Sequence, residues 1–142
     1  MAFTWGRRIK TEEKGQLLPL YAAAMSLALL MLAIMVDLGF MLMYRLELQQ
    51  IAAGAAAAGS EYYDRESFRT GYQVVLDRAA AEAAARLQVQ EGLKAIPDAT
   101  FEVQAEERDV LVTVNRSYRP WWWPVGQVTI TAAERAAPLG VR

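Results

Sequence analysis

An uncharged apolar run near the N-terminus constrains this chain more than any other feature. Residues 17–36 read LLPLYAAAMSLALLMLAIMV and contain no Asp, Glu, Lys or Arg. As an α-helix rising about 1.5 Å per residue, the run spans about 30 Å, the thickness of the hydrocarbon core of a bilayer. Pro19 is expected in the first turn, where its missing N–H costs little. Because the apolar character continues to Tyr44, we predict a membrane-spanning helix over residues 16–44.

The charges before this run predict its orientation. Four basic residues stand there against two acidic ones: Arg7, Arg8, Lys10 and Lys14 against Glu12 and Glu13. Since short basic flanks stay in the cytoplasm, residues 1–15 are predicted to be a cytoplasmic leader and the rest to lie outside. The run is longer than the apolar region of a signal peptide, and no small-residue cleavage site follows it, so we expect a retained, single-pass anchor.

Asp37 interrupts the apolar sequence at its outer edge. It lies about 30 Å from Leu17 along a helix, so it falls at the bilayer boundary, where a charge costs little. Two interpretations stay open. Asp37 is a simple interfacial stop, or with Gly39 it marks the change from lipid to a partner helix.

Helix-forming residues continue beyond the membrane. Residues 45–60 read RLELQQIAAGAAAAGS, so one helix is predicted from Gln16 to Gly59, with 45–60 as an outward extension. The small residues around Gly54 and Gly59 would let another helix approach closely. The alternative is an alanine-rich helix without a partner.

The remaining sequence predicts a small α+β domain over residues 61–136, followed by a tail at 137–142. A second, amphipathic helix is expected from Ser67 to Lys94, because apolar residues recur at helical spacing: Phe68, Tyr72, Val75, Ala79, Ala83, Leu87 and Leu93. After Asp98 the pattern alternates, which predicts strands at 100–105, 110–118 and 127–132. The turn from Glu106 to Asp109 is short enough for a hairpin, so we expect a three-stranded antiparallel sheet.

The composition argues against enzyme chemistry. The chain has no Cys and no His, and its formal net charge is −1. Thiol nucleophiles, imidazole bases and the commonest metal ligands are therefore missing, and no basic field favours nucleic acid. Glu106 and Glu107 are expected to be solvated in a turn. We predict a protein that is not an enzyme and uses no cofactor, metal or nucleic acid.

Three adjacent tryptophans, Trp121, Trp122 and Trp123, stand between Pro120 and Pro124. On an extended chain they cannot all point to one side, so at least one should be exposed or in a contact. They could anchor the domain in a neighbouring subunit or the membrane interface, where Trp is enriched, or cover the end of the sheet. Stacking on sugars or single-stranded nucleic acid is a third hypothesis, but only Arg116 and Arg119 accompany it.

The order of these features resembles the TadE/TadG-like family of pilin-like proteins of tight-adherence pilus systems. The matching positions are Gly15, Asp37-Leu38-Gly39, Arg45, Leu48, Gln49 or Gln50, and the small-residue run from Ala52 to Gly59. Gly54 stands where the family pattern usually has an acid. The resemblance implies a pilin-like α+β fold and a component of a type IV-related pilus or secretion assembly in the bacterial cell membrane. Its partners would be other pilin-like or assembly proteins, or further copies of itself.

The resemblance also implies a processing site. Prepilin-type leaders are cut after a glycine, which corresponds to cleavage between Gly15 and Gln16, and processed relatives usually carry Glu five residues on. Here Leu20 occupies that position, followed by Tyr21. Without the acid, a new N-terminal amine would lack its partner in apolar surroundings. We therefore favour an uncleaved anchor over a processed subunit that polymerises; a membrane-tethered binding module that uses the Trp-rich loop is the other alternative.

Overall fold

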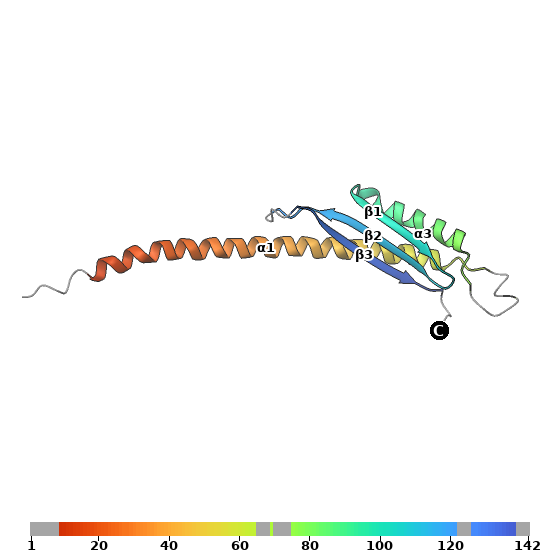
Figure 1. Cartoon of the computed structure of the whole chain (residues 1–142), viewed down its shortest axis with the longest axis horizontal. Helices are drawn as coiled ribbons and strands as arrows, with labels where there is room; N and C mark the ends of the chain where they lie inside the picture. Colours follow the sequence, from red (N-terminus) through yellow and green to blue (C-terminus); the bar gives the residue numbers. More distant parts are fainter. Residues whose placement is uncertain (1–8, 65–68, 70–74, 122–125, 139–142) are drawn as a thin grey trace, which may run out of the picture. The chain divides into compact units, whose positions relative to one another are not determined.

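The computed structural model of the 142-residue chain describes residues 9–64, 69, 75–121 and 126–138, with side chains from residue 17 onward. The elements follow the order α1, α3, the short 3-10 helix η1, β1, β2 and β3 (Figure 1). The chain divides into two compact units, Met1–Gly39 and Phe40–Arg142, which we call the first and second units. Long helix, second helix and antiparallel sheet together make the α+β class that the sequence predicts.

Helix α1 spans Ile9–Ser60, 52 residues without interruption. The expected continuous helix is thus present, but it begins seven residues before the predicted start at Gln16 (16 − 9 = 7), because the helix-forming sequence TEEK precedes the apolar run. Pro19 consequently lies inside the helix and not in its first turn. Proline has no N–H, so one hydrogen bond of the helical ladder is missing at this point.

Three antiparallel strands form the sheet of the second unit, in the order β1-β2-β3. Their bounds are Ala99–Ala105, Val110–Tyr118 and Val128–Ala136. The predicted β1–β2 hairpin is present, and the Glu106 N–H donates to the Asp109 carbonyl at 2.8 Å. β3 continues four residues past its predicted end (136 − 132 = 4), since Ala133–Ala136 pair with Val110–Thr113 of β2.

One face of the sheet and the two helices enclose the core of the second unit. The buried side chains alternate along the strands, as the sequence pattern predicts. The strands contribute Val103, Val110, Val112, Val114, Ile130 and Ala132, α1 contributes Leu48, Ala52, Ala55 and Ala56, and α3 contributes Ala81, Ala85 and Val89. Much of the helical contribution is alanine, so the helices can approach the valine-rich face closely.

Helix α3 spans Arg78–Gly92, so the predicted continuous helix from Ser67 to Lys94 is wrong in its bounds; of residues 67–74 the structure describes Arg69 alone, which is helical. Asp77 caps α3, because its side-chain oxygen accepts from the Ala80 N–H at 3.2 Å. Before it, Leu76 pairs with Tyr63 in an isolated antiparallel bridge, and residues 75–77 are not helical. At the other end, Leu93–Ala95 form η1. Phe68 and Tyr72, expected on this helix, lie outside the described residues.

The predicted apolar face of α3 is also wrong. Ala79, Ala83 and Leu87 are exposed, with Leu87 at 71%, whereas the buried face carries Ala81, Ala85 and Val89. A shift of two residues turns a helix by about 200°, so the buried face is nearly opposite the predicted one. Alanine occurs on both faces, and apolar spacing alone therefore did not identify the side that packs.

Two glycines mark where α1 and α3 pack closely. A Cβ on Gly59 would lie 3.0 Å from the Ala81 carbonyl oxygen and 3.2 Å from both Ala85 Cβ and Val110 Cγ1. A Cβ on Gly92 would lie 2.9 Å from Ile51 Cγ2. The absence of side chains at these two positions lets the helices meet at this distance.

Candidate membrane anchor and interaction surfaces

The first unit presents the apolar surface that the sequence predicts for a membrane helix. Within the part of the chain that the structure describes, one helix is long and apolar enough to cross a membrane. Its most apolar 18-residue window has a mean hydropathy of 2.3, and none of that window is buried. Leu18, Met25 and Met35 are among its exposed side chains. Each large apolar side chain left in water forgoes about 1.5–3 kcal/mol, so this surface fits a lipid environment.

Asp37 is placed on this helix with only 9% of its surface exposed. It belongs to the first unit, which ends at Gly39. Gly39 lies two residues further on, and no described atom is within 4 Å of the position a Cβ would take. Asp37 and Gly39 therefore occupy different faces of α1.

The other two predicted packing positions, Gly59 and Gly54, differ in their surroundings. Gly59 lies against α3 and β2 of its own chain, as described above. Gly54 has open space at its Cβ position, and it lines a shallow groove of about 360 Å³ with Glu47, Gln50, Ile51, Gln88 and Gly92. Gly15 and Gln16, the candidate processing site, lie within the helical backbone of α1.

A polar and aromatic cluster, which sequence reasoning missed, joins α1 to the end of β2. The Arg116 guanidinium carbon lies 4.2 Å from the centroid of the Tyr44 ring, and the Tyr44 and Tyr118 rings are 5.5 Å apart. Arg116 also lies 4.0 Å from a carboxylate oxygen of Glu47, and only 23% of its side chain is exposed. A cation over an aromatic face is stabilised by the ring quadrupole, more so when it is partly shielded from water. The cluster fixes this end of β2 against α1.

The Trp-rich connection begins three residues beyond this cluster. Pro120 is buried, whereas Trp121 is 87% exposed. Trp122 and Trp123 lie outside the described residues. The connection ends near Gly126, whose φ of +75° suits glycine because it lacks a Cβ.

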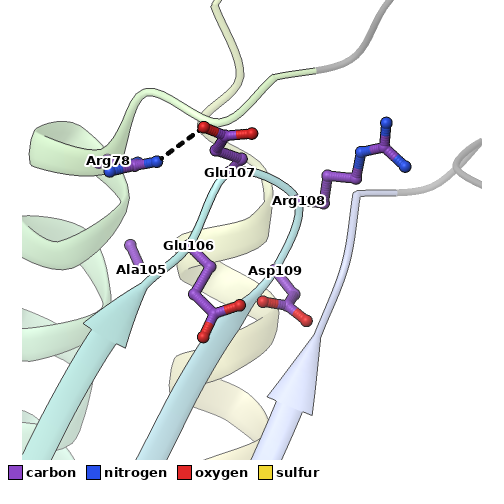
Figure 2. A pocket seen from close by; sticks show the side chains of 6 residues that line it. All are labelled: Arg78, Ala105, Glu106, Glu107, Arg108 and Asp109. Carbon is purple, nitrogen blue, oxygen red and sulfur yellow. Dashed lines mark hydrogen bonds and ion pairs between the residues drawn. The ribbon is translucent and has the colours of Figure 1, made fainter.

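The opposite end of the sheet carries charged side chains around the β1–β2 turn. Figure 2 shows Arg78 turned toward Glu107, to which it is joined at 3.1 Å. Arg135 pairs with Asp109, also at 3.1 Å. The surface hollow there, of about 530 Å³, is lined by Arg78, Ala105, Glu106, Glu107, Arg108 and Asp109. The Arg78–Glu107 pair is exposed and contributes about 0–1 kcal/mol. The Asp109 side chain is only 19% exposed, and its Oδ1 is buried without a hydrogen-bond partner among the described residues.

Neither a search for metal sites nor a comparison with known proteins suggests a function. Among the described residues, no group of three or more acidic side chains could hold a metal ion. No family model, curated protein or solved structure matches the chain. The apolar helix and the surfaces of the second unit therefore carry the functional argument.

Proposed function

We propose that this protein is a membrane-anchored, pilin-like component of a tight-adherence, type IV-related pilus or secretion assembly. It would sit in the bacterial cell membrane with its N-terminus in the cytoplasm and its α+β domain outside. It would act through helix packing and protein contacts, with other pilin-like proteins or further copies of itself as partners.

The observation that carries this proposal is the double use of α1. Its residues 17–36 present an exposed apolar surface, and its residues 48–56 supply buried core residues to the second unit. Both parts belong to one helix, Ile9–Ser60. A helix that supplies both an exposed apolar surface and core residues suits an anchored subunit that works through packing.

The helical backbone around Gly15 supports the uncleaved form of the protein. Helix α1 runs through Gly15 and Gln16, and a peptidase must unwind a helix locally before it can cut. Leu20 in place of the usual acid points the same way. A processed subunit would need both local unwinding and another partner for its new N-terminal amine.

Mass measurement on the native protein, purified from membranes, tests anchoring and processing together. We expect a full-length chain that resists carbonate extraction and is released by detergent. A chain that begins at Gln16 would instead establish the processed subunit, and recovery in the soluble fraction would overturn the anchor.

A deletion strain tests the assembly role. We expect loss of surface pili or of tight adherence, and restoration by the wild-type gene. A photo-crosslinking residue at Leu38, on the exposed helix surface, should capture an envelope protein or a second copy, whereas the same residue at Leu87 on the outer face of α3 serves as the matched control. Normal adherence in the deletion strain, together with no crosslink from Leu38, would refute the assembly proposal.

A further inference from the structure

The outer face of the sheet, which turns away from the core of the second unit, is polar at one end. Thr100 of β1 lies directly opposite Asn115 of β2, and Ser117 of β2 lies opposite Thr129 of β3. Residues paired across strands share a face of the sheet. Val114, next to Asn115 along β2, points into the core from the other face. The three strands therefore bring four polar side chains together on one surface.

A surface hollow of about 390 Å³ lies among these side chains. Residues from all three strands and from the turn before β1 line it: Asp98, Thr100, Asn115, Arg116, Ser117 and Thr129. All of them belong to the second unit. The volume falls within the range of about 300–1,000 Å³ that is usual for small-molecule sites, so the hollow has room for a small ligand.

The side chains of the hollow have hydrogen-bonding capacity that the fold does not use. Within the part of the chain that the structure describes, the hydroxyls of Thr100, Ser117 and Thr129 have no hydrogen-bond partner. The Thr131 hydroxyl donates to Asn115 Oδ1 at 2.7 Å. Because this bond holds the oxygen of the Asn115 amide, its nitrogen, with two donors, is left for another partner.

The charges of the hollow disfavour an anionic ligand. Arg116 is the one basic residue among the described residues that line it. Its guanidinium carbon already lies 4.2 Å from the centroid of the Tyr44 ring, and a guanidinium nitrogen lies 4.0 Å from a carboxylate oxygen of Glu47. The carboxylate of Asp98 would repel a phosphate or another carboxylate. A neutral ligand avoids this repulsion.

The donors and acceptors of the hollow match the hydroxyl groups of a sugar. A sugar hydroxyl both donates and accepts, as the side chains of Thr and Ser do. The amide nitrogen of Asn115 can donate to a sugar oxygen, and the Asp98 carboxylate can accept from two neighbouring hydroxyls. An apolar peptide would find no large apolar side chain among the residues that line the hollow.

We propose that the hollow on the outer face of the sheet binds a neutral saccharide. The polar ends of β1, β2 and β3 would contact the sugar, and the second unit would thereby attach to a neutral polysaccharide. This site goes beyond the proposed assembly role and does not depend on it, since none of its residues lies on α1.

Saturation-transfer NMR on the full-length protein in phosphatidylcholine nanodiscs tests the proposal. The probes are three neutral trisaccharides: maltotriose, cellotriose and triacetylchitotriose. Thr129→Val removes one hydroxyl of the hollow and keeps a β-branched side chain that suits a strand. Thr113→Val is the matched control, because Thr113 lies on the same face and outside the hollow. Circular dichroism checks that both variants fold.

We expect saturation transfer to at least one trisaccharide, with an affinity about 2–10-fold lower in Thr129→Val, the loss expected for one hydrogen bond. Thr113→Val should bind like the wild type, and inorganic phosphate added as a competitor should not displace the sugar.

Three results would overturn the saccharide site. They are no transfer to any of the trisaccharides, an equal response of the two variants, and displacement of the sugar by phosphate, which would indicate an anion site. None of these results bears on membrane extraction or on the mass of the native chain, so the site and the assembly role fail separately.

Discussion

The contrast between Gly59 and Gly54 gives the sharpest quantitative prediction about the fold. Both are helical glycines of α1, five residues apart in nearly the same alanine-rich sequence. A Cβ at Gly59 would lie 3.0 Å from the Ala81 carbonyl oxygen, whereas the Cβ position at Gly54 is open. The same Gly→Ala substitution therefore tests packing at one site and helix propensity alone at the other.

The expected magnitudes follow from two opposing contributions to the free energy of unfolding. Replacing a helical glycine by alanine stabilises a helix by about 0.5–1 kcal/mol, which is the whole effect expected for Gly54→Ala. At Gly59 an overpacking cost of about 1–3 kcal/mol opposes this gain, because the Ala81 oxygen belongs to the backbone of α3 and cannot rotate away. Gly59→Ala is expected to be neutral to about 2 kcal/mol destabilising, so the two variants should differ by about 1–3 kcal/mol.

Thermal unfolding of the full-length protein in detergent, followed by near-UV circular dichroism, measures this difference. For a domain of about 60–100 residues, 1 kcal/mol shifts Tm by about 4–8 °C, so the two variants should be separated by at least that much. Gly92→Ala should also be destabilising, because its Cβ would lie 2.9 Å from Cγ2 and 3.2 Å from Cγ1 of Ile51, and a β-branched side chain in a helix is stiff at χ1. Equal Tm shifts for Gly54→Ala and Gly59→Ala would refute the close packing of α1 on α3.

Three further substitutions test other parts of the structure. Asp77→Ala removes the N-cap of α3 and should cost about 1 kcal/mol in a denaturant titration, with Asp77→Asn as the control that keeps the cap. Arg116→Ala should cost about 0.5–2 kcal/mol in the same titration by removing the cation from the Tyr44 ring, more than Arg78→Ala at the exposed ion pair with Glu107. Asp37→Asn should leave carbonate-resistant membrane insertion unchanged and reduce co-purification of assembly partners; unchanged co-purification would favour the interfacial stop.

The sheet and the long helix could be predicted because their side chains differ strongly between faces or environments. Val110, Val112 and Val114 are all buried along β2, whereas Leu111, Thr113 and Asn115 between and after them are only partly buried, so the period of two identifies the core face. The uncharged run of residues 17–36 likewise leaves few alternatives to a membrane helix. In both cases the pattern in the sequence reflects a large difference in transfer free energy.

The bounds and the buried face of the second helix were predicted less well, because alanine occurs on both its buried and its exposed face. Ala81 and Ala85 face the core while Ala79 and Ala83 face outward, and the prominent apolar residue Leu87 is on the outer side. The start of α3 depends on the Asp77 cap and on the bridge between Tyr63 and Leu76. That bridge joins segments that are distant along the chain, so local propensity did not anticipate it.

The sequence also did not show which of the candidate glycines packs inside the fold and which lies on the surface, because both positions carry the same residue type. Gly54 and Gly59 are separated by five residues, which turns them about 140° apart around the helix. Consequently Gly59 is enclosed by Ala81, Ala85 and Val110, and Gly54 is open. Loss of assembly in a Gly59 variant would therefore report a disturbed fold and not a lost partner. A Gly54 variant keeps the fold and changes only an exposed surface, so it separates helix packing between subunits from packing within one chain.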